Sequence, residues 1–310
     1  MKLMEFATTF AIKVEFPLDP LVVAAFISYS NIQGLGSKTI TSCVSGLNYF
    51  QKSLNAQDLM TYPLIKKALK GLRKSGIKTT PKPAIDISSL EKLMAATEMC
   101  LKDMFEIKLM KCYMAVQFFG LFRVSELLGD VRLHIPAVKY EDFLISQDKL
   151  RLELAQYKHS AGKGAHIEVC SQTIETICPI KLMNDYLQLR GTRPGPLFLL
   201  GNGKPLSKQA LATRFRRCCA AAGLPPRRFS SHSLRIGAAT LAAQMGKSPA
   251  EIMALGRWSS TAYMHYIRSL EPLKAPQSLP LRCPGSSSRQ RPPRTSANPQ
   301  APNAPQTGRR

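Results

Sequence analysis

The sequence predicts an α+β fold in two domains, mainly helical with one small antiparallel β-sheet. Apolar residues recur at helical spacing through the first third and again in several later segments. Two stretches, 149–157 and 165–170, alternate apolar and polar residues instead, which is typical of paired strands. Because 310 residues are enough to bury two cores, we expect a first domain at 1–80, a proline-containing linker at 81–87 and a second domain at 88–271.

The first domain is expected to be helical. Its pattern predicts helices over 19–30, over 37–54 with Ser37 as the N-cap, and over 61–78. Residues 1–16 do not supply a convincing helix, and the stretch ATTFAIKVEF has a β-like composition. We therefore expect this domain to begin with the helix at 19–30.

The predicted helix at 61–78 combines an apolar face with a strongly basic surface. Leu64, Ala68 and Leu72 are expected on the core face. Cations cover much of the remaining surface: Lys66, Lys67, Lys70, Arg73, Lys74 and Lys78.

The second domain is predicted to open with two helices. The first follows a capping-box pattern, Ser88 with Glu91 three positions later, and runs to about Glu98. The second is the apolar segment at 105–122. A β-hairpin with lysines at its turn follows, because the alternating stretches are separated by the glycine-containing KHSAGKG.

Helices resume after Thr173 and continue to about residue 270. Ser248 and Glu251 form a further capping box, and Gly256 suits the C-terminal exit of that helix. Residues 272–310 are rich in Pro, Ser, Gln and Arg, so we expect a disordered basic tail.

The charge of the chain indicates a polyanionic partner. There are 43 Lys and Arg against 20 Asp and Glu, a formal net charge of +23. Seven of these cations and one anion lie from Glu271 onward, which leaves +17 on residues 1–270. Such a body attracts DNA or RNA first and acidic membrane surfaces second, although a merely soluble basic surface is the alternative.

The eight cysteines show neither a C-x-x-C pair nor a cysteine–histidine cluster with zinc spacing. Most lie among apolar residues, so we interpret them as core residues of a protein from a reducing compartment with no structural metal. The N-terminus lacks the apolar core of a signal peptide, and no apolar run approaches the length of a membrane span. We expect an intracellular, soluble protein without a membrane partner.

The stretch LGRWSSTAYMHYIRSL, residues 255–270, raises the question of whether Tyr263 or Tyr266 does chemistry. Aromatic residues three positions apart usually pack on one helix face. A tyrosine hydroxyl has a pKa of about 10, so it is a weak nucleophile unless neighbouring groups activate it. Attack on a phosphodiester would need arginines for the charge on phosphorus and a proton donor for the departing 5′ oxygen.

The sequence has these groups in separate places. His232 and Arg235 are three apart on a predicted helix with Ser230 or Ser231 at its N-cap, so their side chains face one way. Arg123 lies three positions before Glu126, and Lys158 and Lys163 lie at the hairpin turn. Each group alone has a simpler explanation. Arg123 could form a salt bridge with Glu126, and loop lysines are mostly solvated.

Together these residues resemble the catalytic domain of the tyrosine recombinases, or phage-type integrases, over about residues 88–270. The matching motifs are Arg-x-Ser-Glu-Leu at 123–127, the hairpin lysine, His-x-x-Arg at 232–235, Leu-Gly-Arg-Trp at 255–258 and a following tyrosine. The wording HSLRIGAAT and GRWSSTAYMHYIR is most similar to recombinases of eukaryotic mobile elements, namely Crypton, Ngaro and DIRS-like elements. The first third resembles the family's helical core-binding domain.

The resemblance implies a role for each residue. Arg123 and Arg235 would bind the scissile phosphate, with His232 as a general acid/base and phosphate donor. Lys158, with Lys163 as the alternative, would protonate the leaving 5′ oxygen. Tyr266 would be the nucleophile, because Ile-Arg follows it as in the most similar recombinases. Two further residues would support them: Trp258 as a hydrogen-bond donor, and Glu126 as the group that orients Arg123 or His232.

The implied reaction is DNA strand exchange through a 3′-phosphotyrosine, with no metal, ATP or other cofactor. The partner would be double-stranded DNA, gripped by both domains, with basic residues such as Lys66, Lys67, Lys70, Arg73, Lys74 and Lys163 at its phosphates. Four protomers would assemble on two sites, and the eukaryotic resemblance implies the nucleus.

Two departures from the family leave other functions open. The unconvincing first helix suggests a truncated gene copy, and the tail shows none of the helix that family members often donate to a neighbouring protomer. A catalytically silent, DNA-binding remnant of a mobile element is therefore one alternative. A type IB topoisomerase shares the tyrosine chemistry, and a basic helical adaptor of acidic proteins is the third.

Overall fold

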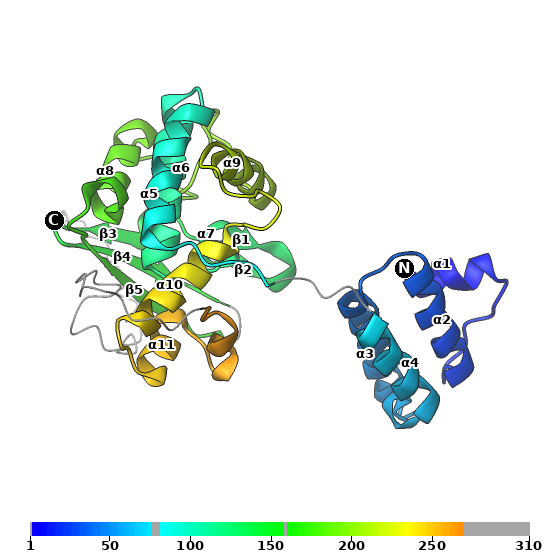
Figure 1. Ribbon diagram of the computed structural model, residues 1–310. Coiled ribbons are helices and arrows are strands. Elements are labelled where there is room, and N and C mark those ends of the chain that lie inside the picture. Colours follow the sequence, from blue (N-terminus) through cyan, green and yellow to red (C-terminus); the bar gives the residue numbers. More distant parts are fainter. Residues whose placement is uncertain (1, 76–80, 158–159, 161, 269–310) are drawn as a thin grey trace, which may run out of the picture. The chain divides into compact units, whose positions relative to one another are not determined.

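The computed structural model describes residues 2–75, 81–157, 160 and 162–268. It divides into two compact units, Met1–Pro81 and Lys82–Arg310, which we call the N-terminal and C-terminal units (Figure 1). Helices dominate both units, and the sheets are small and antiparallel. The predicted α+β class is confirmed. The predicted tail at 272–310 lies outside the described residues.

The N-terminal unit consists of helices around one apolar core. These are α1 (Lys2–Thr9), α2 (Pro20–Ile32), α3 (Ser37–Ser53) and α4 (Pro63–Ser75), with a 3₁₀ turn at Leu59–Thr61. Fully buried residues from all four helices, among them Val23, Ile40, Val44 and Ile65, meet in this core. The predicted helices at 19–30, 37–54 and 61–78 are confirmed as far as they are described.

The absence of a helix from residues 1–16 is a wrong prediction. Helix α1 buries Leu3, Phe6 and Ala7, and the ring of Phe6 lies 5.8 Å from that of Phe26 on α2. Positions 3, 6 and 7 have helical spacing, so one short apolar face outweighs the β-branched residues beside it. Packing against α2 supplies the stability that eight residues alone lack.

Helix α4 carries its cations on the outside. Its buried residues are Ile65, Leu69 and Leu72, so the core face is rotated from the predicted one and Leu64 is exposed. The predicted DNA-contacting residues are all exposed on this helix: Lys66, Lys67, Lys70, Arg73 and Lys74.

The C-terminal unit is built around α6 (Met104–Phe119), whose residues from Leu109 onward are nearly all buried. Six further helices are α5 (Ile87–Cys100), α7 (Val124–Leu128), α8 (Pro179–Arg190), α9 (Lys208–Ala221), α10 (His232–Gln244) and α11 (Pro249–Gly256). Helix α6 packs against α5, α8 and α10, so an element that is apolar on every side lies where helices surround it.

The predicted hairpin is confirmed and belongs to a three-stranded antiparallel sheet. Strands β3 (Phe143–Ile145), β4 (Lys149–Leu154) and β5 (Ala165–Cys170) pair in that order, with Leu152 opposite Ile167. The inward-facing residues Leu150, Leu152 and Leu154 join the main core, as their alternation predicts. A second ladder joins β1 (Gly129–Asp130) to β2 (Ile135–Ala137).

The predicted helix ends are partly correct. Ser248 caps α11 through a capping box with Glu251, as predicted. However, Gly36 rather than Ser37 precedes α3, and Asp86 rather than Ser88 caps α5, by accepting from the backbone N–H of Ser89. In each case the cap lies one or two positions earlier than the sequence suggests, because a serine also fits the first helical turn.

The segment before α5 packs closely onto α10. Ile85 is buried, and its N–H donates to the Ser233 carbonyl at 3.2 Å. A Cβ on Gly237 would lie 1.8 Å from the Ile85 carbonyl oxygen, so only glycine permits this approach. Of the predicted linker 81–87, the residues from Lys82 onward thus belong to the C-terminal unit. Among the described residues, no helix is both long and apolar enough to cross a membrane.

Candidate active site

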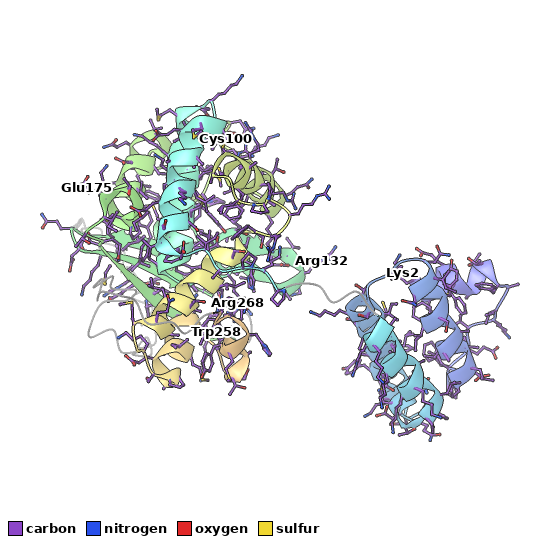
Figure 2. All side chains as sticks on the ribbon, in the orientation of Figure 1. Lys2, Cys100, Arg132, Glu175, Trp258 and Arg268 are labelled. Atoms are coloured by element: carbon purple, nitrogen blue, oxygen red, sulfur yellow. The ribbon has the colours of Figure 1, made fainter. Side chains whose placement is uncertain are left out.

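Three aromatic side chains from separate elements meet in the C-terminal unit. Tyr266 follows the 3₁₀ turn Thr261–His265, His232 begins α10, and Trp258 follows α11. The Tyr266 ring centroid lies 5.1 Å from that of His232 and 4.9 Å from that of Trp258. Figure 2 labels Trp258 in the region of α10 and α11.

The two tyrosines of the 255–270 stretch differ in burial. Tyr263 is 8% exposed and belongs to the main core. Tyr266 is only half-buried, and its backbone is held to α10 because its carbonyl accepts a hydrogen bond from Thr240 Oγ1 at 3.2 Å. Of the two, only Tyr266 combines a ring contact with His232 and a partly exposed side chain.

Arg235 is fully buried beside these aromatic rings. Its guanidinium carbon lies 4.4 Å from the centroid of the Trp258 ring, close enough for a cation–π contact. Its two terminal nitrogens donate to the backbone carbonyls of Leu121 and Gly256. The Nε atom is also buried, and it has no hydrogen-bond partner among the described residues. The side chain is thus held at both terminal nitrogens, while its Nε–H stays unpaired among the described residues.

Glu126 is the common acidic partner of three arginines. Its Oε1 accepts from Arg123 Nη1 at 2.7 Å, and its Oε2 accepts from Arg257 Nη2 at 2.7 Å. Arg235 Nη1 lies 3.8 Å from the same carboxylate. Glu126 also accepts from the backbone N–H of Arg123 at 2.8 Å, which fixes the start of α7. A single buried carboxylate therefore holds the three guanidinium groups together.

The charge balance of this cluster determines the protonation state of Glu126. Burial opposes ionisation, but the nearby cations of Arg257, Arg235 and Arg123 outweigh it and lower the pKa of Glu126 to about 2. The group is ionised at neutral pH. Three cations against one anion leave a net positive charge, which an anionic ligand would neutralise.

His232 is neutral at pH 7. Burial lowers its pKa from the ordinary 6.5 to about 4, and the cations of Arg235, Lys82, Arg123 and Arg268 contribute in the same direction. A neutral imidazole beside a phenol can accept its proton.

Of the two candidate lysines, Lys158 lies outside the described residues. Lys163 is exposed in the loop between β4 and β5, where its backbone N–H donates to the Ser160 carbonyl at 2.9 Å.

The sequence interpretation overlooked two residues of the site. It expected Glu126 to hold Arg123 or His232, whereas its partners besides Arg123 are Arg235 and Arg257. Arg257 was visible only as part of the Leu-Gly-Arg-Trp motif. It lies in the left-handed region with φ of 55°, directly after α11, and takes the position predicted for Gly256 as the helix exit. Thr240 gave no signal, because a threonine within an apolar helix is common.

The chain resembles known proteins in sequence and in fold. Residues 84–271 match the phage integrase family. A protein of Selenomonas ruminantium described as an integrase/recombinase XerD homolog is 28% identical over 163 residues, which are 50% of this chain and 45% of that relative. The chain is thus matched to less than half of this relative's length.

Solved structures show the same fold. The XerH site-specific recombinase bound to palindromic difH substrate matches with a TM-score of 0.61 at 18% identity, over 86% of this chain and 74% of that one. The Tn1549 transposon integrase in complex with circular intermediate DNA matches with a TM-score of 0.56 at 15% identity, over 81% of each chain.

The fold and the arginine–histidine–tyrosine site define a protein of the tyrosine recombinase class. Because the family match covers more than half of its residues, the chain belongs to the phage integrase family.

Proposed function

We propose that this chain is a site-specific DNA recombinase that cleaves and rejoins strands through a phosphotyrosine at Tyr266. The observation that carries the proposal is the contact of Tyr266 with His232, 5.1 Å between ring centroids, beside the buried guanidinium of Arg235. The chain's net charge of +23 and its family membership support a DNA substrate.

In the proposed reaction, the Tyr266 oxygen attacks a backbone phosphorus and its proton passes to neutral His232. A bond forms between the tyrosine oxygen and the 3′ phosphate, while the bond to the 5′ oxygen breaks and that oxygen takes up a proton. Arg123 and Arg235 meet the charge that grows on the non-bridging oxygens. Lys158 or Lys163 would supply the proton to the leaving 5′ hydroxyl.

The energy of the broken phosphodiester is retained in the phosphotyrosine, so the proposed reaction needs neither a metal ion nor ATP. A 5′ hydroxyl from a partner duplex then attacks the phosphotyrosine and releases Tyr266. Exchange between two duplexes implies four protomers on two DNA sites.

We further propose that the protein serves a mobile element and acts in the nucleus. The similarity of HSLRIGAAT and GRWSSTAYMHYIR to recombinases of eukaryotic mobile elements supports this setting. The relation in fold to a transposon integrase is compatible with it.

One observation favours a second candidate, a DNA-binding remnant without catalysis. Arg235 is fully buried, and both terminal nitrogens already donate to backbone carbonyls. If Arg235 keeps these hydrogen bonds, the protein would bind DNA through its basic surfaces, and Arg235 would not contact the scissile phosphate.

Covalent trapping distinguishes the two candidates. Nicked suicide duplexes taken from the sequences flanking the source gene would be incubated in EDTA with wild type, Tyr266→Phe and Tyr263→Phe. We expect an SDS-resistant protein–DNA adduct that is lost only in Tyr266→Phe. Loss of the adduct only in Tyr263→Phe would identify Tyr263 as the nucleophile instead. Salt-sensitive binding without any adduct would favour the remnant.

A further inference from the structure

A cavity of about 270 Å³ lies beside the first turn of α10. Its walls come from α9, from the segment between α9 and α10, and from the residue that opens the C-terminal unit; these elements can be followed in Figure 1. The lining residues are Lys82, Ala212, Phe215, Arg216, Pro226, Arg227, Phe229, Ser230 and Ser231. The cavity is therefore lined by apolar, basic and hydroxyl-bearing side chains together.

The three cations that line the cavity, Lys82, Arg216 and Arg227, are exposed, and none forms an ion pair with a described residue. None of the described residues that line the cavity carries a carboxylate. By contrast Arg214, on the same helix as Arg216, pairs with Glu106. Unneutralised cations that converge on one cavity raise the local positive potential, and an anion placed there would be attracted by all three.

Hydroxyl groups at the cavity also lack partners. Ser230 Oγ is buried and has no hydrogen-bond partner among the described residues. Ser231 precedes α10 as its N-cap, yet its side chain makes no capping hydrogen bond. A buried donor without a partner costs free energy, which an acceptor oxygen in the cavity would recover.

The cavity adjoins the candidate active site through two residues. Ser231 directly precedes His232, and the charge of Lys82 is among the causes that lower the pKa of His232. In addition, the Lys82 carbonyl accepts from Arg268 Nε at 2.9 Å, and Arg268 lies two positions after Tyr266. A DNA strand with one phosphate at Arg235 would therefore carry neighbouring phosphates past this cavity.

We propose that the cavity seats a second phosphate of the cleaved DNA strand, next to the phosphodiester that Tyr266 attacks. Arg216 and Arg227 hold this phosphate, and Lys82 lines the same cavity while its charge acts on His232. Because the cavity holds the phosphate next to the scissile one, it determines which phosphodiester of the strand lies opposite Tyr266. The inference rests on the proposed function for the position of the strand, but the binding of a phosphate can be tested separately.

The first test measures how salt weakens binding to a duplex of arbitrary sequence. The variant Arg216→Gln/Arg227→Gln removes two exposed cations, and Arg193→Gln, an exposed arginine in the loop after α8, is the charge control. Each phosphate contact adds about 0.9 to the slope of log K against log salt. We expect a slope lower by about 0.9 in the double variant and an unchanged slope in the control. Equal slopes in wild type and double variant would overturn the phosphate seat.

The second test locates the phosphate on the suicide duplex. A methylphosphonate replaces one backbone phosphate at a time on either side of the scissile one. At one neighbouring position, we expect the wild-type rate of adduct formation to fall at least tenfold, while the double variant, already slower, loses little more. Equal fold losses in both proteins at every position would refute a specific seat. If wild type forms no adduct on unmodified DNA, the proposed function fails. The salt slope would still show whether the cavity binds a phosphate.

Discussion

Glu126 and Arg257, 131 residues apart in the chain, form a 2.7 Å hydrogen bond inside the C-terminal unit. Arg257 also donates to the Leu121 carbonyl at 2.9 Å, and the same carbonyl accepts from Arg235. Through these hydrogen bonds, Arg257 connects the C-terminal end of α11 to Glu126 on α7 and to Leu121 just after α6. The positions of the arginines at the site depend on this carboxylate.

Replacing Glu126 by glutamine keeps the shape of the side chain but removes its charge. Three guanidinium groups would then face one another without an anion, so we expect a loss of about 3–5 kcal/mol in the free energy of unfolding. Urea denaturation at pH 7 measures the loss. Glu251→Gln is a control, because that carboxylate is an exposed capping-box residue. A loss below 1 kcal/mol at Glu126 would contradict the role of this cluster.

The pKa of His232 predicts a pH dependence of stability. Its folded-state pKa of about 4 lies below the ordinary 6.5, so the unfolded chain binds the extra proton first. The stability that His232 contributes is complete above pH 6.5 and falls as the pH is lowered towards 4. The stability of His232→Gln should fall less over this range, which denaturation at several pH values would measure.

The lowered pKa of His232 also predicts the effect of replacing Lys82, one of the cations that act on it. Lys82→Gln removes one of the cations that lower the pKa of His232, so NMR titration of the imidazole should give a higher pKa than in wild type. An unchanged titration curve would show that Lys82 does not act on this histidine.

Because Gly256 has no side chain, the indole of Trp258 can pack beside it and contact Arg235 and Tyr266. A Cβ at position 256 would be 1.7 Å from Cζ3 of the indole, so Gly256→Ala must displace the ring from Arg235 and Tyr266. We expect a loss of about 1–3 kcal/mol and slower adduct formation. Since Trp258 is the chain's sole tryptophan and is 8% exposed, its fluorescence emission should shift to the red.

Gly46→Ala is the matched control for this substitution. Gly46 also lies in a helix, but a Cβ there has no neighbour within 4 Å. Alanine should leave the emission unchanged and stabilise the chain by up to about 1 kcal/mol. Identical spectra for Gly256→Ala and wild type would contradict the contact between Gly256 and the indole.

Substitutions of Tyr263 and Tyr266 should differ in their effects, the first lowering stability and the second abolishing adduct formation. Tyr263→Ala empties a site in the core, and we expect a loss of about 3–5 kcal/mol. Tyr266→Phe removes only a hydroxyl from a half-buried ring, so the free energy of unfolding should change by less than about 0.5 kcal/mol. Thermal denaturation of both variants, with Tyr263→Phe alongside, measures the difference. Comparable losses for Tyr263→Ala and Tyr266→Phe would contradict the assignment of Tyr263 to the core.

Local patterns predicted the regular elements well. The alternation of Leu150, Leu152 and Leu154 predicts a strand, and β4 is one, because residues that share a face of a sheet share its core. Helix α1 escaped prediction, since eight residues are too few to form a stable helix alone and depend on Phe26 and Tyr29 for packing.

The candidate site was predictable only where a motif carried it. Recognisable motifs contain Arg123, His232, Arg235 and Tyr266. By contrast, two of the three arginines that share Glu126 lie more than 100 positions from it in the chain. Spacing along the chain cannot reveal such contacts. The roles of these residues stay predictions until the tyrosine is trapped on DNA.

Thr240 gives the site one further property. Its hydroxyl shares one proton between the Ile236 carbonyl at 2.9 Å and the Tyr266 carbonyl at 3.2 Å, and it accepts from the Arg268 N–H at 3.3 Å. Thr240 lies on the same helix as His232 and Arg235. The proposed nucleophile is therefore anchored in cis, to the helix that carries the proposed phosphate ligands of the same chain. Each half-site would be cut by the chain that occupies it, so a mixture of Arg235→Ala and Tyr266→Phe chains should show no complementation.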